Sequence, residues 1–255
     1  MSSTNTSLQV IDQLSSTNAV HYNGSYYLIG GNTVINSSDG TTWSSSSIPI
    51  SNMSTITNFA WNHPDKGCPV IKPMTIACGE GNNTLAYSLD GIYWKGLGKI
   101  VLTTRANKAI WNGVLWVAVG AGNYWVATSY DGINWLGRDT QYLNEAYDIA
   151  WNGQVFVAVG VGNNANMAMS FDGVVWNPIP DSNEFFSVCA SAVIWTGKCW
   201  LAYGSGTNTS MICTNPDGWR WSPTTPANLV ISEMVSGINS IGYTDVSASS
   251  VQTFG

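Results

Sequence analysis

The sequence predicts an all-β protein, and more specifically a β-propeller built from four-stranded units. Three observations predict it. A seven-residue phrase of the form Ser-x-Asp-Gly-x-x-Trp recurs along the 255 residues, and a second phrase recurs upstream of it. No segment shows the apolar period of a helix. The repeat length of about 40–45 residues is that of a propeller blade.

The seven-residue phrase, called the box below, occurs in four clear copies and one degenerate copy. They read SSDGTTW at 37–43, SLDGIYW at 88–94, SYDGINW at 129–135, SFDGVVW at 170–176 and NPDGWRW at 215–221. Asp-Gly between two short strands indicates a tight turn, because Gly accepts a positive φ and Asp caps backbone N–H groups. We therefore interpret these box residues as architecture: Asp39, Trp43, Asp90, Trp94, Asp131, Trp135, Asp172, Trp176, Asp217 and Trp221.

The upstream phrase is clearest in AIWNGVLWVAVGAGN (109–123) and IAWNGQVFVAVGVGN (149–163). It indicates strand A, an Asn-Gly turn, an alternating strand B and a Gly-Asn loop. Strand C and strand D flank the box, so each unit has four strands. The aromatic residues that end strand A are expected in the core: Tyr22, Trp61, Trp111, Trp151 and Trp195.

The whole chain, 1–255, is expected to be one propeller domain. Its units cover roughly 18–55, 56–105, 106–145, 146–190 and 191–236. The segment NSIGYTD (239–245) aligns with YDIAWNG (147–153), so 237–255 together with 1–17 predicts a further unit shared by both ends of the chain. Six units in a closed ring are favoured, and five are the alternative.

The box resembles the Asp-box of sialidase-type (BNR) propellers, Ser-x-Asp-x-Gly-x-x-Trp, although Asp and Gly are adjacent here. The resemblance implies a structural turn on the face opposite an active site. The complete unit also resembles repeats of uncharacterised proteins from giant DNA viruses, bacteriophages and bacterial surfaces. That second resemblance implies a fold and a setting, a virion or phage tail, rather than a reaction.

Composition excludes several function classes. Only 9% of the residues are charged and the net charge is −6, so nucleic-acid binding is not expected. The N-terminus lacks the features of a signal peptide, and no apolar run is long enough to insert into a membrane. The location is left open, with a virion or host cytoplasm expected if the protein is viral. The oligomeric state is also left open.

The five Cys residues lack paired CxxC spacing, so neither a zinc site nor another cofactor is expected. Most are expected to be reduced thiols, with a Cys189–Cys199 bridge as the minority alternative. The chain has three Arg residues and matches no sialidase catalytic segment. Scattered carboxylates could approach one face, but such acids are usually solvated: Glu80, Glu145, Glu184, Asp139, Asp148 and Asp181. We expect no enzyme.

The B–C loops repeat a polar Gly-x-Gly-Asn signature that suits sugar hydroxyls, because amides donate and accept hydrogen bonds without charge. The candidate ligand-binding residues are Asn32, Asn82, Asn123, Tyr124, Trp125, Asn163 and Asn208. The alternative is that the signature only forms the turn. A second candidate is a channel mouth at Asn58, Lys108 and Asp148. The expected function is a non-catalytic binding or structural propeller, a virion or phage-tail component with glycan-binding capacity. A protein-interaction scaffold and a glycosidase-like enzyme are the alternatives.

Overall fold

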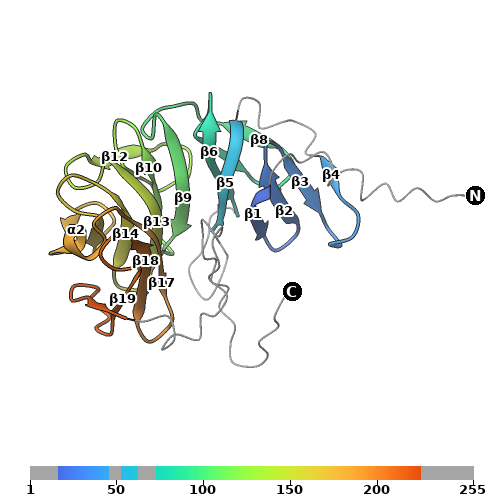
Figure 1. Ribbon diagram of the computed structural model, residues 1–255. Coiled ribbons are helices and arrows are strands. Elements are labelled where there is room, and N and C mark those ends of the chain that lie inside the picture. Colours follow the sequence, from blue (N-terminus) through green and yellow to red (C-terminus); the bar gives the residue numbers. More distant parts are fainter. Residues whose placement is uncertain (1–16, 46–52, 63–72, 225–255) are drawn as a thin grey trace, which may run out of the picture.

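The computed structural model describes residues 17–45, 53–62 and 73–224, and they form five antiparallel units of four strands (Figure 1). Unit 1 contains β1 (Thr17–Tyr22), β2 (Tyr27–Gly31), β3 (Val34–Ser37) and β4 (Ser44–Ser45). Unit 2 contains β5 (Met53–Trp61), β6 (Thr75–Gly81), β7 (Leu85–Ser88) and β8 (Trp94–Gly96). Unit 3 contains β9 (Arg105–Trp111), β10 (Trp116–Ala121), β11 (Val126–Ser129) and β12 (Leu136–Asp139).

Unit 4 contains β13 (Glu145–Trp151), β14 (Phe156–Val161), β15 (Met167–Ser170) and β16 (Asn177–Pro178). Unit 5 contains β17 (Cys189–Trp195), β18 (Trp200–Ser205), β19 (Ser210–Cys213) and β20 (Ser222–Pro223). A one-turn helix that the sequence did not predict, α2 (Ser182–Phe185), lies between units 4 and 5. The prediction of an all-β chain with four strands around each box is confirmed.

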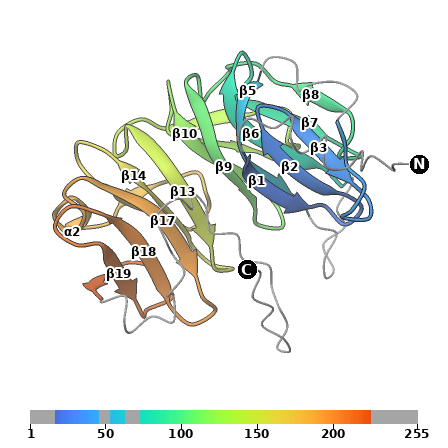
Figure 2. The same cartoon turned by 45° about the vertical axis from the view of Figure 1, so that its right-hand side comes forward.

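The units fan out in an arc whose inner side is formed by the A strands β1, β5, β9, β13 and β17 (Figures 1 and 2). Units 2, 3 and 4 also join through their backbones, because Glu80 pairs with Arg105 and Ala121 pairs with Glu145. The further unit predicted from 1–17 and 237–255 lies outside the described residues except for Thr17. No helix in the described ranges is long and apolar enough to cross a membrane.

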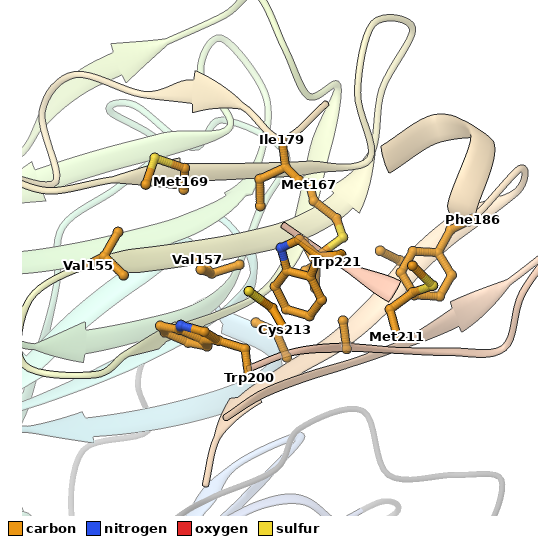
Figure 3. Packing of buried hydrophobic residues seen from close by; sticks show 14 residues of the cluster. Val155, Val157, Met167, Met169, Ile179, Phe186, Trp200, Met211, Cys213 and Trp221 are labelled. Carbon is orange, nitrogen blue, oxygen red and sulfur yellow. The ribbon is translucent and has the colours of Figure 1, made fainter. Parts of the chain in front are cut away.

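The hydrophobic core lies between consecutive units, where the two sheets face each other. Figure 3 shows the layer between units 4 and 5, in which Val157 and Met167 meet Trp200, Met211 and the box residue Trp221. Similar layers lie between units 2 and 3 and between units 3 and 4. Alternation along each strand directs one side chain to the preceding unit and the next to the following unit, so strands B and C are apolar on both faces.

The box builds the same turn in successive units. In unit 4 the Asp172 carboxylate accepts hydrogen bonds from the Ser170 hydroxyl (3.0 Å) and from the backbone N–H groups of Val174 and Val175 (both 2.8 Å). The Trp176 indole Nε1 donates to the carbonyl oxygen of Gly173 at 3.0 Å. Gly173 has φ +75°, which L side chains rarely adopt. This geometry supports the interpretation of the box as architecture.

The aromatic residues that end strand A are less buried than expected. Trp111, Trp151 and Trp195 are half-buried and pack on the first residue of strand B, for example Trp151 on Phe156 with ring centroids 4.1 Å apart. Tyr22 is exposed. Trp111, Trp151 and Trp195 lie next to the A–B turn and pack against the core layer that their unit shares with the preceding unit.

Candidate functional site

The antiparallel order of the strands gives the arc two faces. The A–B turns and the boxes share the box face, and the B–C and D–A loops share the loop face. In units 3 and 5, hydrogen bonds join the B–C loop to the D–A loop that enters the same unit: the Asn123 N–H donates to Thr103 Oγ1 (3.1 Å), and the Asn208 side chain donates to the Phe185 carbonyl oxygen (3.0 Å). These hydrogen bonds between loops fix the positions of the side chains at the strand ends on the loop face.

A group of polar side chains gathers on the loop-face side of the inner strands in units 2 to 4. The Arg105 guanidinium lies between two carboxylates, with Nη1 3.3 Å from Glu80 Oε1 and Nε 2.9 Å from Glu145 Oε1. Asn107 donates to Glu145 Oε1 at 2.9 Å and to the carbonyl oxygen of Ala146 at 2.8 Å. Glu80 and Arg105 are partly exposed, whereas Glu145 is mostly buried. We call Glu80, Arg105, Asn107 and Glu145 the inner cluster.

Two further side chains border the inner cluster. Burial raises the pKa of the Tyr147 hydroxyl, and the nearby Glu145 and Cys189 raise it further, against the opposing effect of Arg105. The Cys189 thiol lies 3.3 Å from Ser205 Oγ. Tyr147 therefore presents a neutral hydroxyl beside the inner cluster, able both to donate and to accept a hydrogen bond.

The inner cluster arises from one register position. The residue six places before the strand A aromatic pairs with the end of strand B of the preceding unit, and this residue is Arg105 in unit 3 and Glu145 in unit 4. The sequence places Glu80 and Glu145 only among several scattered acids, and it does not predict Arg105, Asn107 or Tyr147 as site residues. Aligning this position across the repeats would have placed Arg105 beside Glu145, because adjacent A strands lie next to each other.

The predicted channel mouth is corrected by the structure. Lys108 and Asp148 are buried and bind each other, with Nζ 2.6 Å from Oδ1. Asp148 also accepts hydrogen bonds from the backbone N–H groups of Val193 (3.0 Å) and Ile149 (2.8 Å). Asn58 Oδ1 accepts from the Ala109 N–H at 3.5 Å. Asn58 and Asp148 thus each accept a hydrogen bond from the next A strand, and Lys108 forms an ion pair with Asp148. These residues therefore join neighbouring units and do not line an open channel mouth.

Trp125, a predicted ligand-binding residue, is a core residue. Its side chain is 1% exposed, its Nε1 donates to Asp139 Oδ1 at 2.9 Å, and its ring meets Trp176 edge to face at 5.1 Å. A buried indole with its one donor already paired cannot reach a glycan. Tyr124 is half-buried over Gly137, where a Cβ atom would lie 2.2 Å from the Tyr124 ring. The aromatic side chains of this loop, Tyr124 and Trp125, therefore contribute to packing.

The five loop asparagines differ in what they bind. Asn32, Asn82, Asn123 and Asn163 are exposed on the loop face. Asn163 Oδ1 accepts from Asn144 Nδ2 at 3.4 Å. Asn208 is half-buried and bound to Phe185, which is a turn-forming role. The structure therefore supports the turn interpretation for Asn208 and leaves the exposed four at the surface.

The other acids and the cysteines are placed apart from the inner cluster. Asp139 is bound to Trp125, while Asp181 and Glu184 are exposed at α2. Among the described residues, Cys78, Cys189, Cys199 and Cys213 are free thiols. Cys189 begins β17 and Cys199 directly precedes β18, so they lie at opposite ends of one hairpin and do not form the alternative bridge. In the same described ranges, no group of three His, Cys, Asp or Glu is arranged to hold a metal ion.

No family model and no curated protein matches the chain. Solved structures with propeller-like folds do match it. One is the GH74 enzyme of Niastella koreensis, which is 17% identical with a TM-score of 0.58 over 82% of this chain and 31% of that chain. The GH74 xyloglucanase of Xanthomonas campestris is 13% identical with a TM-score of 0.53 over 83% of this chain and 32% of that chain.

A third match is the extracellular domain of a putative one-component system of B. thetaiotaomicron. It is 10% identical with a TM-score of 0.60 over 90% of this chain and 30% of that chain. The chain thus spans about a third of the length of each of these three structures. At this level of identity the likeness concerns the fold alone: a β-rich, propeller-like arrangement of antiparallel sheets.

Proposed function

We propose that this chain is a non-catalytic binding propeller that recognises glycans through its loop face. The inner cluster is the observation that carries the proposal. It sets partly exposed carboxylate and guanidinium groups side by side, next to the Tyr147 hydroxyl. A sugar hydroxyl both donates and accepts, so it can donate to Glu80 while it accepts from Arg105. The exposed loop asparagines extend this surface outward.

Two points favour binding over hydrolysis. Glycoside hydrolysis needs two carboxyl groups that flank the scissile bond, one of them acting as a proton donor. Glu80 and Glu145 instead face the same guanidinium, each through Oε1. Such an arrangement orients hydrogen bonds and holds charge in place. The GH74 structures named above support a carbohydrate context for this fold, without extending their activity to this chain.

A glycan array of the purified protein tests the proposal. Glu80→Gln keeps the size of a partly exposed side chain and removes one charge from the inner cluster, so we expect its glycan signals to fall at least ~10-fold, as for the loss of a charge-assisted hydrogen bond. Glu184→Gln makes the same chemical change at the exposed α2 and should leave the signals unchanged. Signals that survive in Glu80→Gln, or that are absent from the wild type, would contradict the proposal.

A protein-interaction scaffold is the second candidate, and one observation favours it. The residue before the box Asp is an exposed apolar side chain in three consecutive units: Leu89, Tyr130 and Phe171. A repeated apolar row on the box face suits a protein partner better than a sugar. Under this alternative, Phe171→Ser abolishes partner binding and leaves the glycan array unchanged. A glycosidase-like enzyme would instead release sugar from an array ligand and lose that activity in Glu80→Gln.

The finer architecture is part of the same proposal. We propose that the arc of five described units continues into a closed ring of six, with a ring of five as the alternative. The virion or phage-tail setting implied by the resemblance of the repeats also belongs to the proposal. Immunogold labelling of purified particles would test that setting independently of glycan binding.

A further inference from the structure

The box face of units 2 to 4 carries exposed apolar side chains at fixed positions of the box. Three positions vary between boxes: the residue before Asp and the two residues between Gly and Trp. In each of units 2 to 4, two of these positions hold large apolar side chains that are between 37% and 69% exposed. We call these six residues the apolar stripe: Leu89, Tyr93, Tyr130, Ile133, Phe171 and Val175.

The turn itself does not require apolar residues at these positions. Unit 1 has Ser38, Thr41 and Thr42 there, and it builds the same turn. The Asp39 carboxylate accepts the backbone N–H groups of Thr41 (2.8 Å) and Thr42 (2.6 Å), and the box Asp of unit 4 accepts the equivalent two. Because the bonds use backbone groups, the side chains at these positions can vary. Exposed apolar side chains that the fold does not need indicate a docking surface.

The apolar stripe lies on a fixed surface, because each of its boxes packs against the unit before it. A Cβ atom added at Gly132 of unit 3 would meet Met74 of unit 2, and one added at Gly173 of unit 4 would meet Leu115 of unit 3. The boxes and the preceding A–B turns therefore form a continuous surface across the units. A surface that is already held in place loses little conformational entropy when a partner docks on it.

Carboxylates stand between the apolar side chains of the stripe. Each of its three boxes contributes one, namely Asp90, Asp131 and Asp172, whereas the boxes of units 2 to 4 and the A–B turns of units 3 and 4 contain no Lys or Arg. Burial raises the pKa of these carboxyl groups, but hydrogen bonds from backbone N–H groups and from the box Ser outweigh it and lower the pKa below its usual value. The surface is therefore both apolar and negatively charged.

We infer that the apolar stripe docks a cationic segment of a partner protein, in which Lys or Arg side chains stand among apolar ones. The apolar side chains of the segment cover the stripe, and its cations lie beside the box carboxylates and over the rings of Tyr130 and Phe171. This inference rests on the protein-interaction candidate named above and gives the chemistry of its partner.

The charge disfavours two other occupants of the apolar stripe. A second copy of the chain would bring the same three carboxylates face to face, and like charges across an interface cost binding energy. A membrane that contains anionic lipids attracts basic surfaces and would repel this one. A cationic protein segment is the occupant that matches both the apolar area and the charge.

Fluorescence anisotropy with two short synthetic peptides tests the inference. One peptide consists of Leu and Lys, the other of Leu and Glu, and only the Leu/Lys peptide should bind. Phe171→Ser copies the residue that unit 1 has at the same box position, Ser38, so the turn is expected to form. This variant should bind the Leu/Lys peptide at least ~10-fold more weakly, as for the loss of an aromatic anchor.

Two substitutions at Val175 separate the effect of charge from that of apolar area. Val175→Thr removes an apolar contact, and Val175→Arg also adds a positive charge on the residue whose N–H binds Asp172. Val175→Arg should therefore bind the Leu/Lys peptide more weakly than Val175→Thr, and the difference should shrink as salt is added. Val188→Thr and Val188→Arg are the matched controls, because Val188 is 61% exposed in the D–A loop, against 62% for Val175. Both controls should bind as the wild type does.

Several results would overturn the inference. They include a wild type that does not bind the Leu/Lys peptide, equal binding of both peptides, and equal binding by Val175→Arg and Val188→Arg. A dimer that Phe171→Ser dissociates would replace the cationic segment by a second copy. Binding of phosphatidylcholine vesicles in place of the peptide would replace it by a membrane. None of these residues belongs to the inner cluster, so a blank glycan array contradicts the proposed glycan binding and leaves this inference unchanged.

Discussion

The Lys108 ammonium on β9 lies 2.6 Å from Asp148 Oδ1 on β13, and both side chains are buried between neighbouring units. The second oxygen of Asp148 accepts the N–H of Val193 on β17. One carboxylate therefore connects three consecutive A strands. Removing one partner of a buried ion pair leaves an uncompensated charge, whereas replacing both partners avoids that cost.

Breaking this pair should destabilise the protein strongly. Lys108→Met leaves the Asp148 carboxylate buried without its cation and should cost about 3 kcal/mol in urea unfolding. Lys108→Met/Asp148→Asn should recover most of the loss, because Asn is neutral and keeps an acceptor for the Val193 N–H. A double variant no more stable than Lys108→Met would show that the charge is not the cause.

Alanine at two glycines should separate backbone strain from packing between units. Gly153 has φ +96° with nothing within 4 Å of an added Cβ, so Gly153→Ala should cost about 1 kcal/mol of strain alone. Gly173 has φ +75°, and its added Cβ would lie 3.0 Å from Val117 Cγ2 of the preceding unit. Gly173→Ala should cost about 1 kcal/mol more than Gly153→Ala in chemical unfolding. Equal losses of stability in the two variants would mean that a Cβ added at Gly173 does not clash with Val117 of the preceding unit.

Acid should destabilise the protein through His21. This side chain is partly buried beside Phe59 of unit 2, its Nε2 has no hydrogen-bond partner among the described residues, and burial lowers its pKa from 6.5 to about 4. Because protonation favours the unfolded chain, stability is full above pH ~6.5 and falls as the pH drops toward 4, by about 3 kcal/mol in total.

His21→Ile isolates this effect, because Ile occupies the equivalent position in units 3 and 5, at Ile110 and Ile194. The comparison is the free energy of unfolding of wild type and variant at pH 7 and at pH 4. The variant should lose about 3 kcal/mol less than the wild type over this range. Parallel losses in both proteins would assign the acid sensitivity to other groups.

Below that range the box carboxylates should begin to matter. Burial raises the pKa of Asp131, but hydrogen bonds from the backbone and side chain of Asn134, from the Ile133 N–H and from Ser129 outweigh it and lower the pKa to about 2. The stability from this lowering is present above pH ~4 and disappears as the pH falls toward 2. Asp131→Asn should therefore flatten the unfolding curve between pH 4 and pH 2. Asp131 is mostly exposed, so the effect is expected to be small.

Trp125→Phe should show whether Trp125 acts as a core residue or as a ligand contact. Phe keeps most of the packing against Trp176 but loses the donor to Asp139, which should cost about 1–3 kcal/mol of stability. Because the indole is buried, the glycan signals of the folded variant should equal those of the wild type. Asn123→Ala, at an exposed residue two positions earlier, should leave stability unchanged. Selective loss of glycan binding in Trp125→Phe would restore Trp125 as a ligand contact.

Local sequence patterns predicted much of the fold. The Asp-Gly pair and the Trp of each box predict the turn, and the structure repeats it because the hydrogen bonds of the box Asp side chain join residues within one box, as between Asp172 and Val174. The candidate site was less predictable. Trp125 lies two residues from the exposed Asn123 in the same loop sequence. Trp125 is buried because it packs against Trp176, a contact that the loop sequence does not reveal.

The sequence by itself determined the four-stranded unit, its turns and its repetition, since turn chemistry and alternation act over a few neighbouring residues. Tertiary structure decided which repeats touch, and so which polar side chains meet. Arg105 lies 25 residues from Glu80 and 40 from Glu145 in the chain, yet contacts both carboxylates. Adjacent A strands bring the three together because each unit must bury a sheet face against the next, and no local pattern encodes that contact.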